Sequence, residues 1–537
     1  MAKHAKQLAF GAEARVSLKE GVVKLSRAVK TTLGPSGKNA CIDRGWGEPI
    51  VTKDGASVAD EIDLADPYQN LGARLVRESA EKTSGEAGDG STTATVLAEA
   101  LVVEGQKRIT AGVNPMILAR GMRAAAERVK KSLKKVSTPV KGNNQIRSIG
   151  LIASNGDEEI GDKVASALEE VGSDGVVTIE EGKELETQVE VVEGMDFDRG
   201  YLSPHFVTDP DKMVCELEDP VILIMEEKIS TLQNIVPLLE KVLKAKRSLL
   251  IVAEDVEGEV LATLVVNTLK GVLKCAAVKA PAYGDRRKAI LQDLAVLTGG
   301  QAVFKDLGLD LETLELKDLG RAKTVKITSE NTTVVEGAGK KKDIEARVKE
   351  IRLELEGTTS EYDVDKLQER LAKLVGGVAV VRVGAPTESD MKERKIRYES
   401  ALNATRAAVE EGVVPGGGVA LFRASESLAR LNLDSEEENF GVEIVRRALE
   451  APLRQLVANT GGYIDPATVL RRIRGDKSSN FGYDIRSDEF CDLVKAGVLD
   501  AAKVVRCAFE NALSVATILL TSDALVAEIP QEEDEDE

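Results

Sequence analysis

The sequence is poor in histidine, aromatic residues and long apolar runs. It contains two histidines and one tryptophan among 537 residues, and aromatic residues make up 3% of the chain. Two histidines cannot build the histidine-based zinc sites of most metalloenzymes, and they disfavour a Ser-His or Cys-His hydrolase. So few aromatic rings provide little surface for stacking nucleic-acid bases. The densest apolar run, Val221–Met225, is far too short to span a bilayer.

Cysteine usage and charge narrow the class of protein further. Five cysteines, an odd number without a CxxC pair, are typical of reduced thiols in the cytoplasm. The N-terminal residues lack the apolar core of a secretory signal, so we predict a cytoplasmic protein. Lys and Arg number 72 against 90 Asp and Glu, a net charge of −18. A nucleic-acid-binding protein would need a basic face, so this class is disfavoured.

The hydrophobic pattern differs between the ends and the middle of the chain. Residues 10–135, 401–460 and 495–525 repeat apolar side chains at helical spacing, for example over 94–109. The middle alternates short apolar strands with helices, an α/β pattern. The predicted strands are 176–179, 189–192, 221–225, 249–253 and 276–280, and the predicted helices are 231–245, 257–271 and 286–298. A charged helical stretch over 340–374 follows.

Three segments near the N-terminus have the composition of a phosphate site. Thr32–Pro35 is a glycine-containing turn that is not a Walker A loop, and Thr52–Gly55 places a lysine beside a carboxylate. Gly88–Thr93 precedes the 94–109 helix, whose free amides and three neighbouring hydroxyls would attract an anion. Asp89 would repel phosphate unless a divalent cation lay between them, which favours a Mg²⁺ ligand. The alternative is that Asp89 or a neighbouring hydroxyl is an ordinary helix N-cap.

Two further segments near the C-terminus have compositions that suit a ligand. In Glu410–Ala420 three consecutive glycines follow a helix and would allow a backbone to approach a ligand closely, although a helix cap and turn explain them equally well. Asp500 could accept a hydrogen bond from a ribose hydroxyl.

Taken together, these segments resemble the group I chaperonins, the GroEL family, over almost the whole chain. The most specific matches are Ala407–Leu421, Thr52–Gly55, Ala87–Thr95, Glu193–Pro204, Ala253–Glu259 and Ala280–Lys288. The resemblance implies a multidomain α/β subunit of three nested domains. A mostly helical equatorial ATPase domain would comprise 1–136 and 412–525, and a small intermediate domain 137–192 and 377–411. An α/β apical domain would comprise 193–376, and 526–537 would be a disordered acidic tail.

The resemblance also implies a site for ATP and Mg²⁺, with K⁺ as a further candidate cofactor. Asp89 would hold the Mg²⁺, and Asp54 would help to position water and metal. The implied ATP-binding residues are Thr32, Leu33, Gly34, Pro35, Lys53, Asp89, Gly90, Ser91, Thr92, Thr93, Gly417, Asp484, Ile485, Arg486 and Asp500.

Two positions depart from the family pattern. Ser400 stands where the family has a catalytic Asp, and a hydroxyl is a poor proton acceptor at neutral pH. Glu399 is adjacent, but successive helical side chains point about 100° apart, so it could act only after a local shift. Losing a general base costs ~10²–10⁴-fold in rate, so we expect slow ATP hydrolysis. Asp484–Arg486 stands where the family has Asn-Ala-Ala, and the bulk of Arg486 removes the expectation of the usual base contact.

The client-binding surface is also implied by the resemblance. An apolar apical rim would bind unfolded polypeptides and then a lid-like co-chaperonin of the GroES family. Its residues would be Tyr201, His205, Phe206, Val236, Leu239, Leu261, Val265 and Val266. Hinges at Pro139, Gly194, Gly376, Gly377 and Gly412 would let the apical domain move. For any single glycine, an ordinary loop is the alternative interpretation.

The resemblance finally implies self-assembly into a heptameric ring. Residues 461–465 contain a single acidic residue, Asp465, fewer than expected at a ring-to-ring contact, which leaves single and double rings open. The leading prediction is an ATP-dependent folding chaperonin without nucleic-acid or membrane partners. The alternative is a non-cycling relative that binds ATP, hydrolyses it poorly and acts as a holdase or specialised binding protein. A small-molecule kinase is disfavoured because no second substrate pocket can be named.

Overall fold

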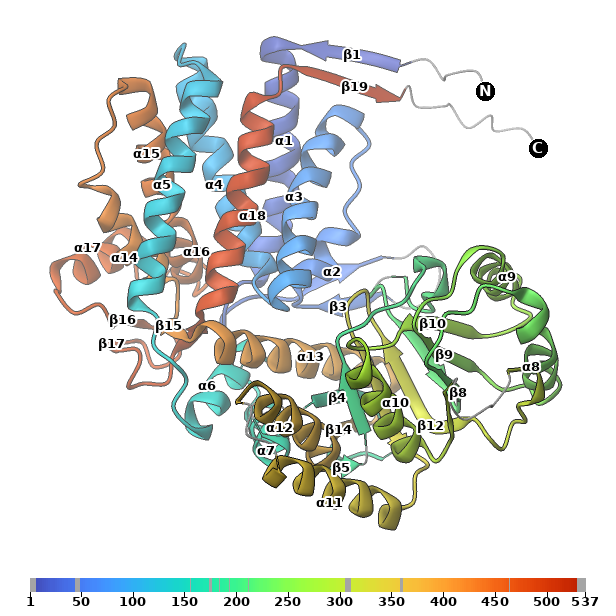
Figure 1. The fold of residues 1–537 in the computed structure, drawn as a ribbon. Coiled ribbons are helices and arrows are strands. Elements are labelled where there is room, and N and C mark those ends of the chain that lie inside the picture. Colours follow the sequence, from blue (N-terminus) through green and yellow to red (C-terminus); the bar gives the residue numbers. More distant parts are fainter. Residues whose placement is uncertain are drawn as a thin grey trace. The chain divides into compact units, whose positions relative to one another are not determined.

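The computed structural model describes residues 6–43, 49–154, 156–172, 176–182, 184–192, 194–210, 212–304, 311–357, 361–462 and 464–528. The chain divides into two compact units, drawn in Figure 1. Unit 1 comprises residues 1–165 and 385–537, and unit 2 comprises residues 166–384. The three-domain division implied by the resemblance stays a prediction. The disordered tail predicted over 526–537 is wrong for 526–528, which pair with the N-terminal strand in a two-stranded sheet, and 529–537 lie outside the described residues.

Unit 1 is mostly helical, and its long helices pack around α18 (Ala502–Thr521), which contacts α3, α4 and α5. Its other helical elements are α1 (Gly11–Val29), η1 (Lys30–Thr32), α2 (Gly55–Asp60), α3 (Pro67–Ala87), α4 (Ser91–Thr110), α5 (Pro115–Val136), α6 (Asn143–Ala153), α7 (Glu158–Val171, which continues past the boundary of the unit), α13 (Glu388–Glu411), α14 (Val419–Leu428), α15 (Glu436–Ala448), α16 (Ala451–Ala458) and α17 (Pro466–Gly475).

Local sequence explains where these helices begin and end. The Asp66 carboxylate accepts hydrogen bonds from the first amides of α3, Pro67 occupies its first turn, and Gly88 ends it in a left-handed conformation with φ of 72°. Asn114 and Pro115 begin α5 in the same way. α18 is long and apolar enough to cross a membrane, but 72% of its most apolar window is buried inside unit 1. That burial is typical of the central helix of a globular core.

Four two-stranded antiparallel sheets complete unit 1. β1 (Lys6–Phe10) pairs with β19 (Ala524–Glu528), and β2 (Ala40–Ile42) pairs with β3 (Ile50–Thr52). β16 (Phe481–Asp484) pairs with β17 (Glu489–Asp492), and β15 (Val413–Pro415) pairs with β18 (Leu499–Ala501). The last pairing sets Val414 opposite Asp500, so it brings the glycine-rich segment beside a carboxylate that is far away in the sequence.

Unit 2 has α/β architecture around an eight-stranded mixed sheet. Three parallel strands at one end of this sheet, in the order β10–β9–β8, are apolar and almost wholly buried, as expected for strands covered on both faces. The strands of this sheet are β6 (Gly194–Phe197), β7 (Cys215–Glu218), β8 (Val221–Met225), β9 (Leu249–Ala253), β10 (Cys275–Lys279), β11 (Ala302–Val303), β12 (Gly320–Ile327) and β13 (Thr332–Gly337).

A second, three-stranded sheet in unit 2 has the order β4–β14–β5. Its strands are β4 (Val176–Glu181), β5 (Gln188–Val192) and β14 (Val378–Val383). The helical elements of unit 2 are η2 (Pro204–Phe206), α8 (Leu232–Lys244), α9 (Gly258–Leu269), α10 (Asp285–Thr298), η4 (Leu311–Thr313), α11 (Lys341–Gly357) and α12 (Glu361–Gly376).

Most elements predicted from the pattern of unit 2 are present. β8 and β9 have the predicted bounds, and α8, α9 and α10 lie within one or two residues of theirs. The strand predicted at 276–280 runs from Cys275 to Lys279, because the buried Cys275 pairs with Leu249 and extends the ladder by one residue. β12 and β13 were not predicted, because charged and polar residues such as Lys323 and Thr332 interrupt their apolar pattern.

The predicted hinge residues occupy special backbone positions. Gly377 has a φ of 62° and lies between α12, which ends at Gly376, and β14. Gly412 has a φ of 83° and follows α13, while Gly194 begins β6. Pro139 comes directly after Thr138, which forms an isolated bridge with Val413. These positions permit a hinge, and movement about them stays a prediction.

Candidate functional site

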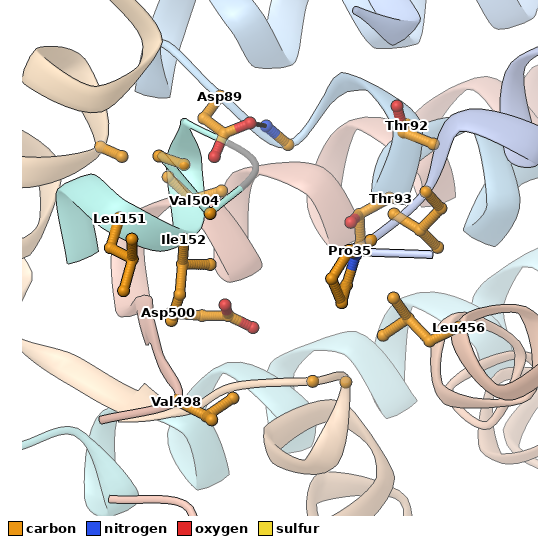
Figure 2. Close-up of a pocket in the computed structure, with 18 of the residues that line it drawn as sticks. Pro35, Asp89, Thr92, Thr93, Leu151, Ile152, Leu456, Val498, Asp500 and Val504 are labelled. Atoms are coloured by element: carbon orange, nitrogen blue, oxygen red, sulfur yellow. Dashed lines mark hydrogen bonds between the residues drawn. The ribbon is translucent and has the colours of Figure 1, made fainter. Parts of the chain in front are cut away.

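Unit 1 contains a cavity of about 630 Å³, lined by segments from both ends of the chain. All fifteen predicted ATP-binding residues line it, and so do Asp54 and Ser400. Glu399 is not among the lining residues. The structure therefore brings together side chains that the sequence separates by more than 400 positions. Figure 2 draws eighteen of the lining residues and labels ten of them.

The N-terminus of α4 faces this cavity without a side-chain cap. Its N-cap residue is Gly90, with a φ of 92°, and among the described residues no side chain accepts a hydrogen bond from the first amides of the helix. The nearby Asp89 carboxylate accepts a hydrogen bond from the Gly90 amide, at 2.6 Å. The N-cap alternative considered for Asp89 is thus not the arrangement found. An uncapped helix N-terminus with the Thr92 and Thr93 hydroxyls beside it suits an anion such as phosphate.

Asp54 is held next to this helix terminus. Its Oδ2 accepts hydrogen bonds from the amide and the hydroxyl of Ser57, both at 2.7 Å, so Asp54 caps α2. A methyl group on the adjacent Gly55 would lie 2.0 Å from Thr92 Oγ1. Only glycine permits this approach, which sets the start of α2 against the first turn of α4. Asp54 thereby serves both as a helix cap and as a wall of the cavity.

The charges that line the cavity are mostly negative. Six carboxylates face it, against the three cations Lys53, Arg397 and Arg486; the six are Asp54, Asp89, Glu158, Glu393, Asp484 and Asp500. Desolvation raises the pKa of Asp500 to about 7, and repulsion from Asp89 adds to the rise. Desolvation likewise raises the pKa of Asp89 to about 6, with a contribution from Asp54 and against the lowering effect of the Gly90 amide. Negative charge therefore exceeds positive charge in the cavity lining, so a polyphosphate would need a further cation beside it.

The residues present fit a Mg²⁺ ion that arrives with phosphates. Among the described residues no group of three His, Cys, Asp or Glu side chains could hold a metal alone. Mg²⁺ in phosphate-transfer sites is bound by one or two carboxylates together with substrate phosphates, so a complete protein cage is not required. Asp89 and Asp54, beside the uncapped helix terminus, supply that smaller set of ligands.

One face of α13 also lines the cavity. Its lining residues recur at helical spacing: Glu393, Ile396, Arg397, Ser400 and Ala404. Glu399 lies off this face, as the 100° rotation per residue requires. A methyl group on Gly88 would lie 2.0 Å from Asn403 Cβ, so α13 touches the turn that carries Asp89. Ser400 lies one helical turn before Asn403 and lines the cavity, whereas the Thr405 hydroxyl bonds back to the Ala401 carbonyl.

The side of the cavity away from the α4 terminus is more apolar. Figure 2 places Ile152, Val498 and Asp500 apart from Pro35, Thr92 and Thr93. Apolar side chains with one carboxyl group are the surroundings that a flat base and a ribose hydroxyl require. Ile152 and Val498 were not predicted as site residues. The apolar face of α6 could have been recognised in the sequence, but its distance from Asp500 could not.

The β16–β17 turn forms part of this second side. Asp484 Oδ1 accepts a hydrogen bond from the Arg486 amide at 2.9 Å, and Oδ2 accepts one from the Ser487 hydroxyl at 3.0 Å. Both carboxylate oxygens are thus used within the turn. Arg486 and Ile485 also line the cavity.

The predicted client-binding residues lie in unit 2, on or near α8, α9 and η2. Val236 and Val266 are 36% and 45% exposed, and His205 is exposed. Tyr201, Leu239, Leu261 and Val265 are half-buried. Phe206 is wholly buried in the core of the unit, so in this structure it has no surface with which to touch a client.

Comparison with known proteins identifies the family. Residues 25–530 match the model of the TCP-1/cpn60 chaperonin family. The chain belongs to this chaperonin family. A relative, "Chaperonin GroEL 1" of Rhodopirellula baltica, is 55% identical over 533 residues, which cover 99% of this chain and 93% of the relative.

The family assignment confirms the predicted resemblance and fold class. This chaperonin is a multidomain α/β protein of the GroEL type, with a role in protein folding. Its family consists of ATPases that use ATP and Mg²⁺. The chaperonin ATPase that the resemblance implied is therefore confirmed at the level of the family.

Proposed function

We propose that this chaperonin binds ATP with Mg²⁺ in the unit 1 cavity and uses it to drive folding of captured polypeptides. The observation that carries the proposal is the uncapped N-terminus of α4, facing a cavity that Asp54 and Asp89 also line. In it the amides of Gly90–Thr93, the turn Thr32–Pro35 and Lys53 bind the phosphates. Asp500 and the backbone at Gly417 contact the sugar.

Asp89 and Asp54 hold the Mg²⁺, which when bound neutralises phosphate charge. Desolvation raises the pKa of Asp89, so a bound Mg²⁺ would stabilise the charged form of this carboxyl group. K⁺ is a further cofactor that the same carboxylate-rich wall suits. Asp54 positions the attacking water through the oxygen that does not cap α2.

Hydrolysis is slow because Ser400 occupies the position that faces the phosphates from α13. Ser and Thr hydroxyls inside helices commonly bond back to the carbonyl four residues earlier, as Thr405 does to Ala401 at 2.7 Å. Among the described residues Ser400 has no such bond, so its hydroxyl is available to hold water in the cavity. It orients water but accepts a proton poorly, which leaves proton removal to the carboxylates of the opposite wall.

Unit 2 supplies the client surface in this proposal. Exposed and half-buried apolar residues of α8 and α9 bind unfolded polypeptides without sequence preference, and a heptameric ring multiplies these weak contacts. Hinge movement at Gly194, Gly376, Gly377 and Gly412 then transfers the client to a chamber closed by a co-chaperonin of the GroES type. The assembly is a cytoplasmic ring, single or double.

A second function, favoured by Ser400, is that of a holdase that binds ATP without useful turnover. One experiment separates the two: refolding of a denatured enzyme by the full-length chaperonin with a GroES-type lid, run beside a phosphate-release assay. Recovery that requires ATP, and is lost when ATP is replaced by a non-hydrolysable analogue, supports the folding cycle. Suppression of aggregation that is equal with and without ATP contradicts it and supports the holdase.

A further inference from the structure

Arg486 extends along the cavity from the β16–β17 turn and is exposed. Its guanidinium Cζ and Nη2 lie 3.5 Å from the position that a Cβ atom on Gly156 would take. Gly156 lies between α6 and α7 and lines the same cavity. The side chain therefore reaches from one wall of the cavity to another.

The guanidinium of Arg486 has no protein partner within the part of the chain that the structure describes. Its backbone amide bonds to Asp484, but both oxygens of that carboxylate are already used inside the turn. Two other arginines near the cavity do have partners: Arg397 pairs with Glu393, and Arg472 lies over the Phe490 ring at 4.0 Å. Arg486 thus presents a planar cation to whatever enters the cavity.

The position of Arg486 indicates which part of a bound nucleotide its side chain would contact. Gly156 follows α6, the helix that places Ile152 on the apolar side of the cavity, away from Thr92 and Thr93. The phosphate-binding amides of α4 lie on the other side. A guanidinium plane stacks well on an aromatic ring, whereas an ammonium group is a point charge without a plane.

We propose that Arg486 covers the base of the bound nucleotide and so sets the affinity of this chaperonin for ATP and ADP. The inference rests on the proposed function, which places a nucleotide in this cavity with its phosphates at α4. In this arrangement Arg486 acts on the base and not on the phosphates. It closes the apolar slot beside Ile152 and Val498 and slows nucleotide release.

The test uses the full-length chaperonin, with Kd values for Mg-ADP and for Mg-tripolyphosphate measured by calorimetry. Loss of one stacking contact should raise the Kd for ADP about tenfold in Arg486→Ala. The Kd for tripolyphosphate, which has no base, should not change. Arg486→Lys keeps the charge without the plane and should resemble Arg486→Ala. Lys495→Ala removes one positive charge from a side chain that is 85% exposed and outside the cavity lining, so it should bind both ligands normally.

Other results overturn the inference. ADP binding that is unchanged or tighter in Arg486→Ala would show that the guanidinium does not cover the base. Equal weakening of ADP and tripolyphosphate would show that it acts on the phosphates, and full affinity in Arg486→Lys would show that charge alone suffices. In each of these cases the unaltered chain still binds both ligands. If the unaltered chain binds neither, the proposed nucleotide site itself is wrong.

Discussion

The two sides of the unit 1 cavity differ in how they are built. The phosphate side consists of backbone amides and short side chains fixed by helix termini: α4 begins without a cap, and Asp54 caps α2 while Gly55 touches Thr92. The base side consists of apolar side chains and a hairpin turn, with Arg486 reaching across it toward Gly156. The phosphate side is therefore fixed by main-chain geometry and tolerates few substitutions, whereas the base side can change through substitution of single side chains.

The largest expected effect is on the phosphate side. Asp89→Asn keeps the shape of the side chain but removes the charge that holds Mg²⁺, so ATP turnover should fall about a hundredfold or more. Phosphate release at saturating ATP, with Mg²⁺ varied, measures the change. Asp63→Asn is the matched control, because Asp63 is exposed, pairs with Arg77 and does not line the cavity. Near-normal turnover in Asp89→Asn would remove Asp89 from the site.

The next effect concerns Asp500, whose pKa is raised to about 7 in the folded chain against an ordinary value of 3.8. Because of this raised pKa, the folded state binds more protons than the unfolded state between pH 3.8 and about pH 7. The free energy of unfolding therefore falls as the pH rises through this range. The Asn of Asp500→Asn does not titrate, so the variant keeps its stability as the pH rises. Without nucleotide, its free energy of unfolding relative to that of the unaltered chain should increase by about 2 kcal/mol from pH 5 to pH 8. Urea unfolding midpoints at the two pH values measure it. If the difference in stability between the variant and the unaltered chain were the same at both pH values, the Asp500 carboxyl group would not be desolvated.

A smaller effect compares two hydroxyls, one on each side. Thr93→Val removes a hydroxyl that lies beside the uncapped α4 terminus and should raise the Kd for ATP about fivefold, the scale of one lost hydrogen bond. Ser487→Ala removes a hydroxyl that already bonds to Asp484, so ATP affinity should change less than twofold. Calorimetric titration of both variants checks the contrast. Equal effects would mean that the two sides are not functionally distinct.

Much of the phosphate side could be predicted from the sequence because its determinants are local. Gly88–Thr93 and Thr52–Gly55 contain the turn, the hydroxyls and the carboxylates within a few residues. The base side depends on long-range packing: Ile152 and Val498 are ordinary apolar residues until the fold places them near Asp500. The burial of Phe206 also depends on long-range packing: this residue was predicted on the apolar rim, but it packs in the core of unit 2.

In unit 2, strands with a continuous apolar sequence could be predicted, whereas strands that contain both apolar and polar residues could not. β8 and β9 have continuous apolar sequences and were located to the residue. β12 alternates buried and exposed residues only over its first four positions, Lys323 among the exposed ones, and two of its partners, β7 and β8, lie about 100 residues earlier in the chain. Pairing, not local propensity, makes it a strand.

The central claim is that Ser400 limits ATP hydrolysis in an otherwise complete site. The most direct test is the single-turnover rate of phosphate release at saturating Mg-ATP, measured for the unaltered chaperonin and for Ser400→Asp. A carboxylate at this position restores a general base, so the rate should rise at least about tenfold while the Kd for ATP changes little. Equal rates in the two proteins would contradict the claim and assign proton removal to a residue other than the one at position 400.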